Sequence, residues 1–251
     1  MARTSMQKPE SLTTLVARHL RRAIIEADLK LGEVLSEDKI AALLHVSRTP
    51  VREALSLLQM QGLIEVVPQR GSFVFLPSSR DIAALAEYRV MLEQQAATLA
   101  LTRAPEATLR DMRKALTLMD KARVRKDAIA YARADDLFHL ATFEHCDNSY
   151  LKEGYNAVSG RIAALRCHLS GPLKLFQNQT LGEHKSMAAA VEARDLAALL
   201  KRIRAHIEGM QANYKRAIDD GLVQVPSKRP QLKGPRRGRP KETAETAPAV
   251  R

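Results

Sequence analysis

The chain has 251 residues, a length that suits one or two domains. It has two cysteines, neither in a CxxC pair, which excludes a disulfide framework. No apolar run approaches the ~20 residues of a membrane span, and nothing resembles a signal peptide, so we expect a cytoplasmic protein without a membrane partner. Its formal net charge of +12 indicates a polyanionic partner or a basic tail.

Three helices are predicted before residue 62. The first follows a frayed lead, residues 1–10, and its apolar side chains recur at helical spacing from Leu12 to about Ala27. The second starts at the candidate N-cap Ser36 and ends at His45-Val46. Its apolar face is predicted to contain Ile40, Leu43 and Leu44.

The third predicted helix starts at a second N-cap candidate, Ser47, and has two different faces. Pro50 falls in the first turn, where a missing N–H costs nothing, and Gly62 is a natural stop. The buried stripe is predicted to contain Val51, Ala54, Leu55 and Leu58. The opposite face carries Arg48, Arg52, Ser56 and Gln59.

A two-stranded hairpin is predicted next, with strands at residues 63–67 and 72–76 and Gln69-Arg70-Gly71 at the tip. A helix with arginines near its N-terminus fits a DNA major groove, where arginine pairs bidentately with guanine. The basic hairpin tip can reach neighbouring phosphates or the minor groove. The alternative is a solvated helix whose arginines pair only with Glu53 or Glu65.

The segment HVSRTPVREAL, which starts at His45, and the following QGLIEVVPQRGSFV closely resemble the winged helix-turn-helix of the GntR superfamily of bacterial transcriptional regulators. The resemblance covers about residues 12–75. It implies contacts with DNA, or a place in the wing, for Ser47, Arg48, Thr49, Arg52, Arg70 and Gly71. Some members carry an arginine in the preceding helix, where this chain has Asp38 or Lys39, so no contact is assigned there.

After the boundary at Pro77-Ser78-Ser79 the pattern is helix after helix, with no convincing strand. The predicted helices span about 80–103, 105–125, 127–145, 148–169, 176–193 and 195–218. Short connections favour a compact bundle of six or seven helices. The sequence therefore predicts a mostly α protein: a winged helix-turn-helix of three helices plus a β-hairpin over residues 1–78, then an all-α bundle over residues 79–225.

Four polar residues fall on helix faces that otherwise point into the bundle. Asp135 and His139 are four residues apart, so their side chains meet on one face, and His184 and His206 lie within apolar stripes. Buried imidazoles beside a carboxylate are costly unless something shares them. One Asp and three neutral His suit Zn²⁺, Ni²⁺, Mn²⁺ or Fe²⁺. Core histidines satisfied by hydrogen bonds are the alternative.

The bundle resembles the C-terminal effector domain of the FadR subfamily, called FCD, over residues 80–215. The matching pieces are Arg89-x-x-x-Glu93, Asp135-x-x-Phe138-His139, Asn148, Glu183-His184 and His206. The resemblance implies a divalent metal ion held by Asp135, His139, His184 and His206. Asp136 is a rival for the first place, whereas His145 and His168 match no ligand position.

The same resemblance implies that the metal holds a small organic acid, because a cation with three or four protein ligands keeps open positions for a carboxylate or hydroxyl. Arg89 would clamp the carboxylate, or else form an i,i+4 ion pair with Glu93. Arg161 and Arg166 are further pocket candidates, and Glu183 is expected to point away from the site.

Residues 226–251 carry eight basic and two acidic side chains, which is half of the excess charge. They are rich in proline and poor in large apolar groups, so we expect them to be disordered. Arg237-Gly238-Arg239-Pro240 resembles the core of an AT-hook, which lays Arg-Gly-Arg into the minor groove of A·T-rich DNA. A merely solubilising tail is the alternative.

Together these patterns predict a homodimeric, ligand-responsive transcription factor, a repressor rather than an enzyme, that binds double-stranded operator DNA. Two copies of the N-terminal domain would read a palindromic operator, and the acid would change operator affinity. The alternatives are a metal-dependent hydrolase or isomerase, in which the metal activates water, and a metal-ion sensor.

Overall fold

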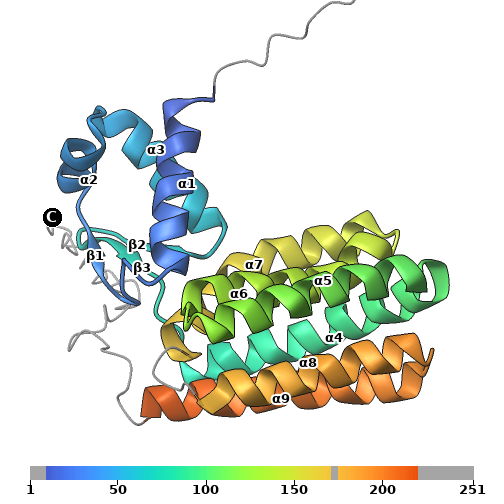
Figure 1. Ribbon diagram of the computed structural model, residues 1–251. Coiled ribbons are helices and arrows are strands. Elements are labelled where there is room, and N and C mark those ends of the chain that lie inside the picture. Colours follow the sequence, from blue (N-terminus) through green and yellow to red (C-terminus); the bar gives the residue numbers. More distant parts are fainter. Residues whose placement is uncertain (1–9, 171–174, 220–251) are drawn as a thin grey trace, which may run out of the picture.

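The computed structural model describes residues 10–170 and 175–219, in two parts (Figure 1). The N-terminal part, called the head below, contains α1 (Leu12–Ile25), β1 (Val34–Leu35), α2 (Glu37–Leu44), α3 (Arg48–Met60), β2 (Ile64–Val67) and β3 (Gly71–Val74). The second part, the bundle, contains α4 (Ser79–Arg103), α5 (Pro105–Val124), α6 (Ala128–His145), α7 (Ser149–Ser170), α8 (Leu175–Glu192) and α9 (Leu196–Asp219). The predicted fold class is confirmed, with six bundle helices in the described ranges.

Local signals set the ends of the head helices. The Ser36 side chain accepts a hydrogen bond from the backbone N–H of Lys39, and His45, at φ 53°, ends α2 in the left-handed conformation. Gly62, at φ 66°, ends α3 as predicted. Ser47 occupies the N-cap of α3 with an extended backbone but without a side-chain cap hydrogen bond.

The apolar face predicted for α3 is confirmed, and that predicted for α2 is partly wrong. The stripe of α3 is buried at Val51, Ala54, Leu55 and Leu58. In α2, Leu43 is 71% exposed. The buried face instead passes through Ile40 and Ala41, with Leu44 half-buried, which places Leu43 on its flank.

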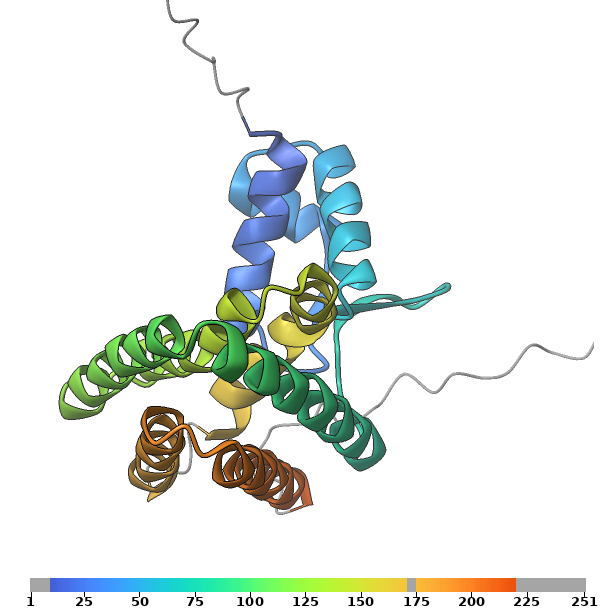
Figure 2. The ribbon, with the colours of Figure 1, turned by 90° about the vertical axis from the view of Figure 1, so that its right-hand side faces the viewer.

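A strand that the sequence did not predict completes the wing. β1 pairs with β3, so the antiparallel sheet has the order β1-β3-β2, with Val34 opposite Phe73. Two residues are too few to show the alternation of a strand, so only the pairing reveals β1. The β2–β3 hairpin projects sideways from the head (Figure 2). Gln69 (φ 62°) and Gly71 (φ 108°) make its tip in the left-handed region.

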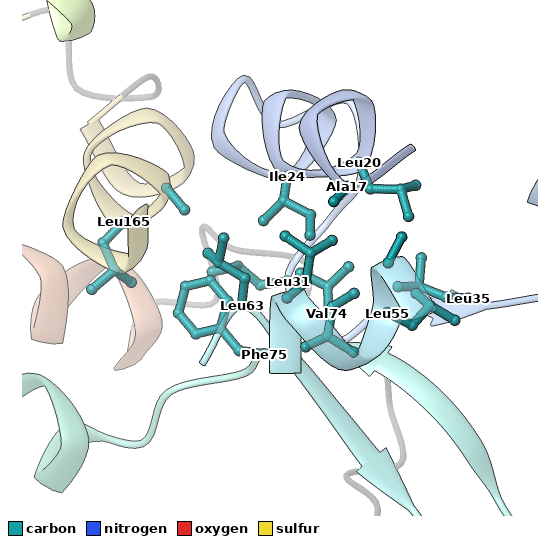
Figure 3. Close-up of a cluster of buried hydrophobic side chains, with 14 of the residues drawn as sticks. Ala17, Leu20, Ile24, Leu31, Leu35, Leu55, Leu63, Val74, Phe75 and Leu165 are labelled. Atoms are coloured by element: carbon teal, nitrogen blue, oxygen red, sulfur yellow. The ribbon is translucent and has the colours of Figure 1, made fainter. Parts of the chain in front are cut away.

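One hydrophobic core joins the head to the bundle. Leu31 and Leu55 lie inside the head, and Leu165 of α7 lies against the same cluster next to Leu63 and Phe75 (Figure 3). The α9 helix also contributes Met210, Tyr214 and Ala217. A domain as small as the head buries little apolar surface alone, so these bundle helices complete its core.

The bundle helices begin at the residues that favour helix starts. Ser78 and Asp81 form a capping box at α4, Pro105 is the first residue of α5, and Asp127 caps α6. The α7 helix runs beside the head (Figure 1) and packs against α1. Within the described ranges, no helix combines the length and the apolar character that a membrane crossing needs.

Candidate functional site

Three histidines from three different helices converge in the middle of the bundle. His139 comes from α6, His184 from α8 and His206 from α9, and all three side chains are buried. Each offers a ring nitrogen that lies within 4.8 Å of the corresponding nitrogens of the other two. The sequence predicted that these histidines face the interior, and the structure brings them together.

Two glutamates fix the orientation of two of these rings. His139 Nδ1 donates to Glu93 Oε2 at 2.7 Å, and His206 Nδ1 donates to Glu183 Oε2 at 2.7 Å. In the neutral form each ring then keeps a lone pair on Nε2. A carboxylate behind a ligating imidazole is the usual outer partner at a metal site, since it fixes both the tautomer and the ring orientation.

The expectation that Glu183 points away from the site is wrong. Its neighbour His184 faces the three-histidine centre, and Glu183 reaches His206 because α9 packs against α8. Burial alone would raise the pKa of Glu183, but hydrogen bonds from His206 and Gln179 lower it. The contact depends on how α8 and α9 pack against each other, so no local sequence pattern predicts it.

His184 has no such partner. Its Nε2 lies 3.2 Å from His139 Nε2, and its buried Nδ1 has no hydrogen-bond partner among the described residues. Burial lowers the pKa of both His184 and His206, which favours the neutral rings. Two neutral nitrogens facing each other must share a proton or a cation, so the residues present fit a metal ion.

Asp135, and not Asp136, faces the imidazoles. Its Oδ1 lies 3.5 Å from His184 Nε2 and its Oδ2 lies 3.6 Å from His139 Nε2. Asp136 instead pairs with Nη1 of Arg166. Arg166 Nε also lies 2.7 Å from Asp135 Oδ2, a charge contact without the alignment of a hydrogen bond. Burial would raise the pKa of Asp135, but the Arg166 guanidinium holds it below its usual value.

Arg89 forms the ion pair that the sequence left as one of two alternatives. Its Nε donates to Glu93 Oε1 at 2.8 Å, so Glu93 joins Arg89 to His139. The Nη2 of Arg89 is buried and has no hydrogen-bond partner among the described residues, and the same holds for the Tyr155 hydroxyl. Burial would raise the pKa of Glu93, but Arg89 and His139 lower it.

Of the two further pocket candidates, Arg166 lies at the polar centre, beside Asp135. Arg161 lies at the junction with the head, where a Cβ added to Gly62 would meet its guanidinium carbon at 3.0 Å. The two histidines without a ligand match also have other partners. His145 Nε2 bonds Asp111 Oδ2 at 2.7 Å, and His168 Nε2 donates to a backbone carbonyl of α1 at 2.8 Å.

The residues predicted to touch DNA lie exposed on the head. They are Ser47, Arg48, Thr49 and Arg52 at the start of α3, with Arg70 and Gly71 at the hairpin tip. The arginines of α3 do not pair with Glu53 or Glu65 as the alternative supposed. Arg52 pairs with Glu37, and Arg48 with Asp38, both in the first turn of α2. Arg237, Gly238 and Arg239 lie outside the described residues.

A winged helix-turn-helix head on a helical bundle with a buried polar centre defines a DNA-binding transcriptional regulator with a second, all-helical domain. Residues 12–74 match the gntR family of bacterial regulatory proteins, and residues 84–209 match the FCD domain. The chain therefore belongs to the gntR family and carries an FCD domain.

Relatives along most of the chain are transcriptional regulators. The gluconate operon transcriptional repressor of Bacillus subtilis (strain 168) is 27% identical over 201 residues, covering 78% of this chain and 82% of that protein. The Uxu operon transcriptional regulator of Escherichia coli (strain K12) is 29% identical over 229 residues, covering 83% and 87%. A GntR transcriptional regulator from Rhodococcus sp. RHA1 has a similar solved structure, with a TM-score of 0.73 at 28% identity, covering 82% and 98%.

Proposed function

We propose that this protein is a cytoplasmic, homodimeric repressor of the FadR subfamily, whose FCD domain holds a divalent metal ion and a small organic acid. Acid binding would alter operator affinity. The observation that carries the proposal is the buried centre in which Glu93 and Glu183 orient the rings of His139 and His206 toward His184. Such outer carboxylates are typical of metal-ligating imidazoles.

Asp135, His139, His184 and His206 would hold the ion. When bound, the ion would supply positive charge and open positions for a carboxylate or hydroxyl. The protein itself supplies the rest of an acid site. The buried Nη2 of Arg89 and the hydroxyl of Tyr155 are donors without hydrogen-bond partners among the described residues, and an anion would satisfy them.

The relatives support an acid as the effector. One is named for the gluconate operon, and gluconate is a hydroxy acid. A bound metal ion would accept the hydroxyl and carboxylate oxygens of such an acid as ligands. The guanidinium of Arg89 suits its carboxylate, because guanidinium groups bind carboxylates bidentately. We propose a small hydroxy acid or dicarboxylate as the effector class.

The α7 helix gives such an effector a route to the head. Arg166 contacts Asp135 and Asp136 at the centre, and Leu165 on the same helix packs into the core of the head. An acid that pairs with Arg166 would compete with these carboxylates and shift α7. Effector binding changes operator affinity only if the acid binds the two arrangements unequally.

The metal assignment is tested on the full chain. Metal content of the purified protein is compared with that of a His139→Ala/His206→Ala double variant. His145→Ala is the matched control, because His145 pairs with Asp111 away from the centre. We expect near-equimolar metal in the wild type and the control and none in the double variant. A fully loaded double variant would refute the ligand set.

The regulatory assignment is tested with DNA from the region upstream of the protein's own gene. Metal and a panel of organic acids are titrated independently against operator affinity, and the same samples are assayed for turnover of each acid. Release of DNA by one acid, with the metal held constant, supports the proposal. Release by the metal alone indicates a metal-ion sensor, and turnover of an acid indicates a hydrolase or isomerase.

A further inference from the structure

Glu37, the first residue of α2, holds one edge of the Arg52 guanidinium. Glu37 Oε2 accepts from Arg52 Nη2 at 2.8 Å and from Nε at 3.1 Å, and Oε1 lies 3.2 Å from Nε. A guanidinium is a planar fork with two such two-donor edges. Glu37 occupies the Nε–Nη2 edge. None of the described residues occupies the other edge, Nη1–Nη2, at the tip of the Arg52 side chain.

That remaining edge has the geometry needed to read a base. Arginine recognises guanine by donating two parallel hydrogen bonds to O6 and N7 in the major groove. A carboxylate on the side edge restricts the rotamers of the long side chain and leaves its tip pointing outward. We propose that Glu37 is a positioning residue that fixes Arg52 for base reading. This inference rests on the proposed DNA contact of Arg52.

Glu37 is the more enclosed partner of this ion pair. It lies in the first turn of α2, behind the N-cap Ser36, and its side chain is 31% exposed, whereas that of Arg52 is 68% exposed. The hydrogen bond from Arg52 lowers the pKa of Glu37, so the carboxylate stays ionised well below neutral pH. The support therefore comes from the more enclosed partner, and the more exposed partner is the one free to meet DNA.

The neighbouring pair differs in a way that supplies a control. Asp38 pairs with Arg48 from the same turn of α2, but both side chains are more than 60% exposed, and this ion pair lacks the aligned hydrogen bonds that join Arg52 to Glu37. Exposed ion pairs of this kind contribute little free energy, because holding two long side chains in one geometry costs conformational entropy. Removing the Asp38 charge changes the electrostatics of the head by the same one unit as removing that of Glu37. It leaves the edge-on support of Arg52 in place.

The test measures affinity for the operator and for a scrambled duplex of equal length, over a range of salt concentrations, using the full chain. Glu37→Gln should lower the ratio of operator to scrambled affinity by roughly fivefold or more, which is the smaller end of what one bidentate base contact supplies. Asp38→Asn should strengthen binding to both duplexes alike and leave the ratio within about twofold. Thermal unfolding of each variant shows that the head is intact.

Two further variants separate this inference from the proposed contact. Arg52→Ala should lose the same discrimination, and adding Glu37→Gln to it should change nothing more. If Arg52→Ala keeps wild-type discrimination, the proposed contact and the inference both fail. If Arg52→Ala loses discrimination while Glu37→Gln keeps it, or shifts both duplexes as Asp38→Asn does, the contact stands and the positioning role of Glu37 is refuted.

Discussion

His168 of α7 donates a hydrogen bond from Nε2 to the carbonyl oxygen of Ile24, at the end of α1, over 2.8 Å. The same end of α1 is held from the bundle by Arg133, which pairs with Glu26. The two contacts attach helices α6 and α7, which carry Asp135, His139 and Arg166 of the polar centre, directly to the head. Since Arg166 is two residues from His168, movement at the centre and movement of the head involve the same turn of α7.

Replacing His168 by alanine should weaken this attachment. The loss of one hydrogen bond to a buried carbonyl should lower the free energy of unfolding by about 1 kcal/mol. The change of operator affinity caused by effector should also shrink, while operator affinity itself stays close to that of the wild type. Titration of operator with and without effector measures it, and His145→Ala is the control. An undiminished effector response would show that His168 does not couple the polar centre to the head.

The same histidine predicts a dependence of stability on pH. Burial lowers the pKa of His168, although its hydrogen bond to the Ile24 carbonyl opposes the shift. The unfolded chain therefore binds a proton at His168 more readily than the folded chain does. The contribution of the neutral ring to the free energy of unfolding is fully present above an unfolded pKa of about 6.5, and it is lost as the pH falls below that value. Urea unfolding at about pH 7.5 and 5.5 should show a larger loss for the wild type than for His168→Gln. Equal losses would contradict it.

Removing the Arg166 charge should be strongly destabilising. In the metal-free protein, Arg166→Met would leave the buried carboxylate of Asp135 and that of Asp136 without their cation, at a cost of about 3–5 kcal/mol in the free energy of unfolding. The matched control is Arg113→Met, whose ion pair with Glu192 is exposed and should matter by less than about 1 kcal/mol. Denaturant unfolding of both variants measures the difference. Similar values would mean that the buried triad contributes no more than a surface pair.

Glu183→Gln should weaken metal binding without removing a ligand. The carboxylate accepts from His206 Nδ1, and loss of such an outer partner lowers metal affinity by about 10–100-fold. Competition against a chelator of known affinity measures the change. Glu208→Gln, which breaks only an exposed pair with Arg204, should bind metal like the wild type. An unchanged affinity in Glu183→Gln would show that this contact is only structural.

Deletion of residues 226–251 tests the basic tail. The tail holds half of the net positive charge, so its removal should lower affinity for nonspecific DNA and reduce the dependence of that affinity on salt. Binding of scrambled duplex by the full chain and by the truncated chain, over a range of salt, measures the slope. Arg237→Ala/Arg239→Ala in the full chain isolates the AT-hook-like motif. An unchanged slope in the truncated chain would leave the tail without a role on DNA.

The sequence by itself determined the helices, their ends and the residues that face inward. Ser36, Pro105 and Gly62 act on their own few neighbours, and the stripe from Val51 to Leu58 follows from helix periodicity, so both can be read without knowing the rest of the fold. The same periodicity predicted that His139, His184 and His206 face the interior. The two-residue strand β1 is too short to show a period, and helix periodicity placed Leu43 on the buried face of α2 although the structure exposes it on the flank of that face.

Only the tertiary structure decided which partner each polar side chain has. Glu183 reaches His206 across two helices, Arg166 and not Arg161 lies at the polar centre, and Arg52 rests on Glu37 of another helix. It also placed Leu165 of the bundle in the core of the head. These contacts join residues far apart in the chain. Their formation depends on how the helices cross and rotate, and no spacing along the sequence records that.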